Sequence, residues 1–75
     1  MFVLIDSINK VKNFVNIASK IEGDIFLKSG RYLIDGKSIM GIFSLDLNYP
    51  IEMIFEGLED IQYEDAVAKL KEFIL

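Results

Sequence analysis

Residues 36–45 constrain the fold of this 75-residue chain more than any other stretch. The stretch begins at Gly36, carries a hydroxyl at Ser38 where a helix could start, and then becomes strongly apolar. It is too short and too rich in apolar residues for an ordinary surface helix. We therefore predict a short helix over residues 38–45 that can bury only part of its apolar surface.

The segments before this stretch show the patterns of a strand and a helix. Residues 2–5 form a short apolar run, which predicts a buried strand. Asp6 and Ser7 are good N-cap residues, and an amphipathic helix should follow them and end at Gly23. The apolar stripe of this helix is expected to contain Ile8, Val11, Phe14, Val15, Ile17, Ala18 and Ile21.

Two strand-like runs precede the central helix, at residues 24–28 and 31–34. The Ser29-Gly30 pair between them predicts a hairpin turn, because glycine adopts the backbone conformations that tight hairpins require. After the central helix, residues 46–50 should form a loop, since Pro50 cannot continue a helix.

The last third of the chain predicts one more strand and one more helix. Residues 51–56 place Ile51, Met53 and Phe55 on one face, which is the alternation of a half-buried strand. Residues 57–62 are rich in acid and predict a linker. The final helix should direct its apolar side chains inward, and these are Tyr63, Ala66, Val67, Leu70, Phe73 and Ile74.

The predicted order is therefore strand, helix, strand, strand, helix, strand, helix. A hairpin in the middle and right-handed crossovers elsewhere give one four-stranded antiparallel sheet with three helices on one face. The predicted fold class is an α+β open-faced β-sandwich. Because so short a chain has room for one core only, we expect a single domain over residues 1–75.

Composition and charge argue against several classes of function. The net charge of −4, from 12 acidic and 8 basic residues without a basic stripe, disfavours nucleic-acid binding. No apolar run approaches the roughly 20 residues that span a bilayer, and the absence of cysteine suits the cytoplasm. We expect no metal or cofactor, because the following acids lack a metal-binding spacing and should form a solvated face: Glu56, Glu59, Asp60, Glu64 and Asp65.

The central stretch allows two comparisons with known motifs. Gly36-Lys37-Ser38 matches the end of a phosphate-binding P-loop, but the glycine required five positions earlier is Arg31, which excludes that motif. The sequence Lys37-Ser38-Ile39-Met40-Gly41-Ile42-Phe43-Ser44-Leu45 resembles the K-S-[IL]-M-G-x-x-S-L signature of HPr, the small phosphocarrier of the bacterial sugar phosphotransferase system. The resemblance runs without gaps from about Ala18 through Leu47. It implies a bacterial protein with the open-faced β-sandwich derived above.

The same resemblance predicts a change of function. In HPr proteins a histidine near the start of the first helix accepts the phosphoryl group, beside an arginine and a proline. The resemblance places these three positions at Ser7, Asn9 and Lys10, and the chain contains no histidine. A phosphoimidazole can pass its phosphoryl group on, whereas a serine phosphate ester is stable, and Asn9 lacks the guanidinium fork that binds phosphate oxygens. We therefore expect no ordinary phosphocarrier activity.

Two features of the central stretch are candidates for function. Ser38 matches the serine that a dedicated kinase phosphorylates in HPr proteins of many Gram-positive bacteria. It should also cap the helix, and the free amides and dipole of a helix start favour an anion. The resemblance further implies an exposed apolar patch for partner enzymes, at Ile39, Met40, Phe43 and Leu47. Ile42 and Leu45 should instead lie in the core.

These observations predict a non-enzymatic HPr-like protein that acts by binding other proteins. Its expected partners are phosphotransferase-system enzymes, an HPr kinase or a regulator, and neither nucleic acid nor a membrane. Two alternatives stay open at this point. The chain could be a phosphotransferase-system carrier with an unrecognised acceptor, or an interaction module of an unrelated complex that keeps only the fold.

Overall fold

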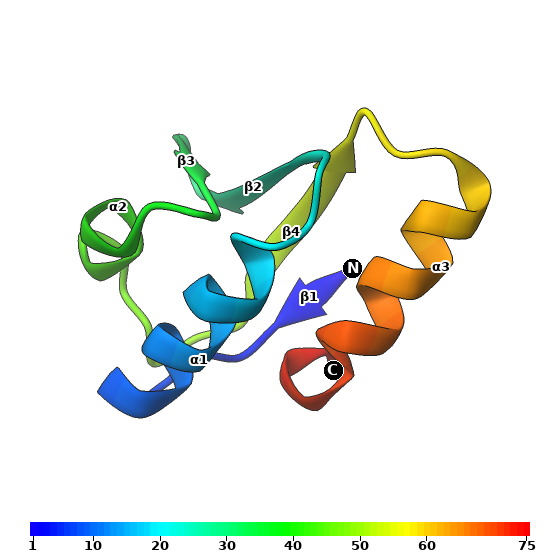
Figure 1. The fold of residues 1–75 in the computed structure, drawn as a ribbon. Helices are drawn as coiled ribbons and strands as arrows, with labels where there is room; N and C mark the ends of the chain where they lie inside the picture. The colour runs from blue at the N-terminus through cyan, green and yellow to red at the C-terminus, as the bar shows by residue number, and fades with distance from the viewer.

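The computed structural model describes residues 1–75 as a four-stranded antiparallel sheet with helices on one face (Figure 1). The elements follow the predicted order: β1 (Phe2–Val3), α1 (Ile8–Ala18), β2 (Asp24–Ser29), β3 (Tyr32–Asp35), α2 (Ile39–Phe43), β4 (Ile51–Glu56) and α3 (Asp60–Lys69), followed by the 3-10 turn η1 (Lys71–Phe73). The predicted α+β open-faced sandwich is confirmed. None of its helices is long and apolar enough to cross a bilayer.

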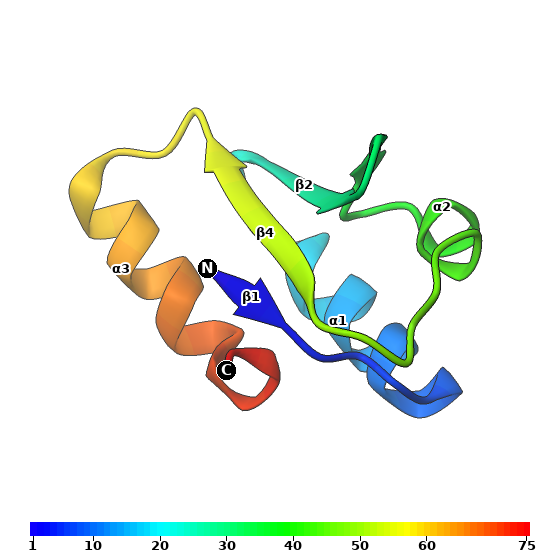
Figure 2. The same cartoon turned by 180° about the vertical axis from the view of Figure 1, so that it is seen from behind.

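The sheet has the strand order β1-β4-β2-β3, so the first strand pairs with the last. Directly opposite residues share a face, and Val3 pairs with Ile51 while Leu27 pairs with Met53; all four are buried under the helices. Figure 2 shows the sheet from behind, with β1 and β4 in front of α1. The other face of the sheet therefore carries no helix.

One hydrophobic core joins the helices to the covered face of the sheet. The ring of Phe14 in α1 meets the ring of Phe73 in η1 edge to face, with centroids 5.4 Å apart. The core consists of Val3, Ile5, Val11, Phe14, Ala18, Ile21, Ile25, Leu27, Ile42, Leu45, Ile51, Met53, Ala66, Leu70 and Phe73. Every element apart from the edge strand β3 contributes to it.

The predicted strand at residues 2–5 is too long. β1 ends where its partner β4 begins, because Val3 pairs with Ile51, the first residue of β4. The chain end pairs with the other edge of β1: the amide of Leu75 donates to the carbonyl of Phe2 at 3.0 Å, and the amide of Leu4 donates to the carbonyl of Phe73 at 2.9 Å. β1 therefore lies between β4 and the chain end.

The first helix starts after Ser7 as predicted, but it ends earlier than predicted, and its first residue does not face inward. The amides of Lys20 and Ile21 donate to carbonyls three residues back, at 3.1 and 3.0 Å, so the chain tightens after Ala18 and turns Ile21 into the core. Ile8, predicted to face inward, is 63% exposed. The first turn of α1 lies at one end of the molecule, away from α3 (Figure 1).

The hairpin turn lies one residue later than predicted. Ser29 pairs with Tyr32, so the two turn residues are Gly30 and Arg31. Gly30 has a φ of 59° and Arg31 does not have a positive φ, which fits the primed turn that places glycine first. The strands are correspondingly β2 to Ser29 and β3 from Tyr32 to Asp35.

The predicted linker at residues 57–62 and the final helix are both corrected by local hydrogen bonds. Glu59 and Gln62 form a capping box, in which the amide of Glu59 donates to Oε1 of Gln62 at 3.0 Å. α3 therefore begins at Asp60. It ends at Lys69, and Ile74, predicted on its inner face, instead pairs with a residue of β1 in an antiparallel bridge.

Tyr63 was predicted to point inward from the last helix, and it lies at the margin of the core. Its ring packs edge to face on Phe55 of β4, with centroids 5.3 Å apart, while the residue stays 41% exposed. The apolar ring thus covers the sheet and the hydroxyl reaches water, which is the usual compromise for tyrosine. Ala66, Leu70 and Phe73 are buried as predicted.

Candidate functional site

The start of α2 is built by side chains that replace missing helix hydrogen bonds. The hydroxyl of Ser38 accepts from the amide of Gly41 at 3.2 Å, which confirms the predicted N-cap. The chain reaches this position through a turn, because the amide of Ser38 donates to the carbonyl of Asp35 at 3.0 Å and the amide of Lys37 donates to Oδ1 of Asp35 at 2.9 Å. Ser38 is therefore held in a defined, half-buried position.

Gly41 allows α2 to pack directly on the sheet. A Cβ atom at this position would lie 2.6 Å from Cγ2 of Ile34 in β3, closer than real side chains approach. The absent side chain thus lets the helix backbone rest against the edge strand. α2 lies at one end of the molecule, opposite α3 (Figures 1 and 2).

The end of α2 decides which apolar residues are buried. The amide of Leu45 donates to the carbonyl of Ile42 at 3.0 Å, so the chain stays coiled beyond Phe43. Ile42 is fully buried and Leu45 nearly so. The hydroxyl of Ser44 donates to the carbonyl of Gly41 and helps to close the helix.

The outer side of α2 carries two exposed apolar side chains. Met40 is 77% exposed and Phe43 is 41% exposed, as the resemblance to HPr implies. Ile39 and Leu47 are half-buried and pack against the core, so they contribute less of the surface. We call Ile39, Met40, Phe43 and Leu47 the α2 surface.

A depression of about 300 Å³ lies beside this surface, between the hairpin turn and the end of α2. Its lining residues are Ser29, Gly30, Arg31, Tyr32, Ser44, Leu45 and Asp46. Arg31 places a cation at its rim, and Tyr32 is 67% exposed. The depression extends the α2 surface toward the β2–β3 hairpin and was not anticipated from the sequence, because the hairpin and α2 meet only in the folded chain.

The side chain of Lys37, the residue before Ser38, is held by a distant backbone carbonyl. The Lys37 ammonium donates to the carbonyl of Ile21, at the end of α1, and so ties the α2 turn to that helix. The amides of Ile39 and Met40 have no intrahelical partner, as helix geometry requires. An anion on Ser38 would therefore be received by backbone amides and not by this lysine.

Ser7, which the resemblance aligns with the phosphoryl-accepting histidine of the family, is the N-cap of α1. The hydroxyl of Ser7 accepts from the amide of Lys10 at 3.1 Å and caps α1. The Lys10 ammonium donates to Oδ1 of Asp6 at 2.9 Å, and this hydrogen bond, together with the charge of Lys10, lowers the pKa of Asp6. Asn9 is exposed. The cation nearest in sequence to Ser7 is thus already paired with a carboxylate.

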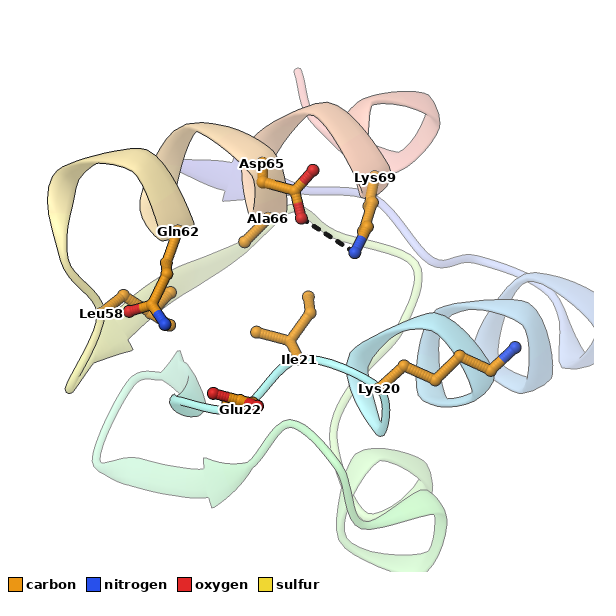
Figure 3. A pocket seen from close by; sticks show the side chains of 8 residues that line it. All are labelled: Lys20, Ile21, Glu22, Leu58, Gln62, Asp65, Ala66 and Lys69. Carbon is orange, nitrogen blue, oxygen red and sulfur yellow. Dashed lines mark ion pairs between the residues drawn. The ribbon is translucent and has the colours of Figure 1, made fainter.

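A second depression, of about 280 Å³, lies between the end of α1 and α3 (Figure 3). Its polar rim includes Lys20, Glu22 and Gln62, and Asp65 and Lys69 form an ion pair of 2.8 Å across one turn of α3. Two lysines and two carboxylates line it, and its volume is just below the usual range of small-molecule sites. The arrangement selects no single ligand charge, so this depression is not the candidate site.

Comparison with known proteins places the fold and the α2 stretch in one family. The family model of the PTS HPr component, described by its phosphorylation site, matches residues 9–75. The chain belongs to the HPr family. The match begins after Ser7, so it covers α2 and Ser38 but not the residue that the resemblance aligns with the family histidine.

Solved HPr-family structures have the same fold. The crystal structure of HPr-C-His from Thermoanaerobacter tengcongensis matches with a TM-score of 0.77 and 25% identity, over 96% of this chain and 85% of that protein. The Bacillus subtilis catabolite repression protein Crh, whose structure is an intertwined, domain-swapped dimer, matches with a TM-score of 0.66 and 26% identity, over 100% of this chain and 88% of that one. No curated protein sequence matches this chain.

Proposed function

We propose that this HPr-family protein is a cytoplasmic, protein-binding regulator that does not relay phosphoryl groups through histidine and is not an enzyme. It would act through the α2 surface, under control of phosphorylation at Ser38. Its partners would be phosphotransferase-system enzymes, an HPr kinase or a regulator. The observation that carries the proposal is the exposure of Met40 and Phe43 directly beside a capping serine, in a chain without histidine.

The chemistry of the first helix supports the loss of the carrier role. Ser7 stands at the aligned acceptor position, and a phosphate ester there would be too stable to transfer. The carboxylate of Asp6 lies next to it and holds the ammonium of Lys10, which leaves no free cation from this turn to bind phosphate oxygens. Negative charge beside the hydroxyl also disfavours the approach of an anionic phosphoryl donor.

The shape of α2 supports the binding role. Methionine adapts its shape to different partners, and exposed apolar side chains next to a depression are typical of docking sites. Phe43 offers a ring that can fill a pocket on a partner, as aromatic anchors do. The half-buried Ile39 and Leu47 would surround this centre and exclude water from it.

The surroundings of Ser38 support control by phosphorylation. A phosphoserine adds about −1.5 to −2 charges at neutral pH and three acceptor oxygens. The unpaired amides at the start of α2 could donate hydrogen bonds to those oxygens without disturbing the core. The new charge would lie one turn of helix or less from Met40, so it would change the docking surface while the fold is kept.

The carrier role is tested by incubation with phosphoenolpyruvate and the general phosphotransferase enzyme. We expect no acid-labile phosphate on this protein, while a histidine-containing HPr in the same reaction becomes labelled. An acid-labile phosphoryl group that can be transferred onward would support the alternative, a carrier with an unrecognised acceptor, and would overturn the proposal.

The binding role is tested by capture of partners from the organism's own cytosol, with wild-type protein and a Met40→Asp variant. We expect phosphotransferase-system proteins or their regulators among the partners lost in the variant. Capture of an unrelated complex would favour the second alternative, an interaction module that keeps only the fold. Identical capture by both proteins would remove the α2 surface from consideration.

A further inference from the structure

No helix of this chain covers the open face of the sheet (Figure 2), and the centre of that face is apolar. Phe26 and Ile54 pair directly across β2 and β4, and both point away from the helices because their neighbours Ile25 and Phe55 point toward them. Both are half-buried. Leu33 of β3 lies on the same face and is 59% exposed.

Carboxylates surround this apolar centre unevenly. Asp24 and Glu56 pair directly, two residues along their strands from Phe26 and Ile54, so two negative charges face each other on the open side. Neither forms an ion pair, since the two ion pairs of the chain join other residues. On the far side of Phe26, its partner on β3 is Asp35, a third carboxylate.

The cations of the open face do not neutralise the end of the face that carries Asp24 and Glu56. Lys28 is the single lysine on the open face, and it pairs across the strands with Glu52, two residues away from the apolar centre. The sequence contains no lysine or arginine between Lys37 and Lys69. Asp24 and Glu56 therefore meet without a counter-charge, an arrangement that destabilises an isolated sheet.

We propose that this face binds a second protein, through a segment that presents lysine or arginine side chains next to apolar ones. The apolar side chains would cover Phe26 and Ile54, and the cations would lie between Asp24 and Glu56. The surface is distinct from the α2 surface, so the protein could hold two partners at once. We call Asp24, Phe26, Ile54 and Glu56 the open-face site.

The charge of the open-face site favours a cationic protein segment over a second copy of the chain or an anionic lipid surface. A second copy of the chain would bring the same uncompensated carboxylates against its own, and like charges at an interface oppose association. An anionic lipid surface is repelled for the same reason. A segment with cations gains from both the apolar centre and the paired carboxylates.

The test uses the whole protein and three synthetic nine-residue peptides, with alternating Lys/Leu, Lys/Ser and Glu/Leu. Nuclear magnetic resonance titration should show that the Lys/Leu peptide shifts the amides of the open-face site. The Lys/Ser and Glu/Leu peptides should bind at least about tenfold more weakly, because each lacks one half of the complementarity. Equal binding of either control peptide would overturn the proposal.

Matched variants show which carboxylates bind the lysines of the Lys/Leu peptide. The double variant Asp24→Asn/Glu56→Gln should weaken Lys/Leu binding about tenfold, whereas Asp60→Asn/Glu64→Gln on α3 should change it less than about twofold. Equal losses would mean attraction to the overall negative charge and would refute the site. Loss of affinity with Met40→Asp would also refute it, because that residue lies outside the open-face site.

The free protein provides a second, independent readout. Removal of the facing charges in Asp24→Asn/Glu56→Gln should raise the melting temperature by about 1–8 °C, since like charges directly opposite each other destabilise a strand pair. A lower melting temperature would show that the two carboxylates are not in conflict and would overturn the argument. Sedimentation showing a dimer that this variant disrupts would assign the face to a second copy instead.

Discussion

The contrast between Met40 and Ile42 is the sharpest test of how α2 divides its apolar residues. The two positions lie two residues apart on the same short helix, and aspartate is introduced at each in turn. Met40 is 77% exposed and Ile42 is fully buried. If the division is correct, Met40→Asp should disrupt docking and Ile42→Asp should disrupt the fold.

The magnitude for Met40→Asp follows from its exposure. Full burial of a methionine side chain stabilises by about 1.5–3 kcal/mol, so the 23% of its surface that is covered contributes about 0.3–0.7 kcal/mol. Aspartate forms helices less well than methionine, by about 0.5 kcal/mol, but an acid in the first helical turn gains about 0.3–1 kcal/mol. The net change in the free energy of unfolding should remain under about 1 kcal/mol.

The magnitude for Ile42→Asp is much larger. Truncation of a buried isoleucine alone costs about 2–5 kcal/mol, and an unpaired carboxylate in the core adds several more. The total stability of a domain this small lies near the lower end of about 5–15 kcal/mol. We therefore expect Ile42→Asp to be largely unfolded at 37 °C.

Thermal melting by circular dichroism measures both effects. One kcal/mol shifts the melting temperature of a domain of this size by about 4–8 °C, so Met40→Asp should melt within about 8 °C of the wild type. Ile42→Ala is a milder core variant that keeps the comparison measurable, with an expected loss of at least about 8 °C. If Met40→Asp melts as low as Ile42→Ala, Met40 belongs to the core and the α2 surface is not available to partners.

Three further predictions concern α2 and the start of α1. An HPr kinase should place one acid-stable phosphate on the protein, and Ser38→Ala should abolish this phosphorylation. The same variant should lower the free energy of unfolding by about 0.5–2 kcal/mol, because α2 loses its cap. Phosphate found on another residue by mass spectrometry would contradict the prediction. Gly41→Ala should destabilise the fold by about 1–3 kcal/mol in urea titrations, because the new Cβ would meet Ile34. In the double variant, Ile34→Ala should recover part of this loss, whereas additive losses would argue against the contact. Pairing with Lys10 lowers the pKa of Asp6 from its ordinary value of 3.8. The ionised carboxylate therefore stabilises the fold above pH 3.8, and this stabilisation is lost as the pH falls through the lowered pKa. Asp6→Asn should therefore reduce the loss of stability between pH 5 and pH 2, and an unchanged acid profile would count against the pair.

The order of elements and the division of α2 could be predicted from the sequence, because both depend on local pattern. Alternation in residues 51–56 and the 3.6-residue period of the helices identify the faces that leave water. The capping of α2 by Ser38 depends on residues only three apart, so it too is local. The HPr resemblance in residues 37–45 rests on the same contiguous stretch.

The ends of the elements were predicted less well, and the reasons differ. The capping box of Glu59 and Gln62 was present in the sequence, but its acidic surroundings suggested a linker. The end of β1 could not be predicted locally, since it depends on where β4, its partner from the last third of the chain, begins. Strand ends are set by their partners, and partners are chosen by the tertiary fold.

Long-range contacts also decided the features most important for function. The sequence shows that Gly41 lies in α2, but only the fold brings it against Ile34 of β3. Likewise Asp24 and Glu56 are more than thirty residues apart, and only the pairing of β2 with β4 makes them opposite neighbours. Side-chain pattern determines which residues leave water, whereas strand register, which depends on the whole core, determines which charges meet.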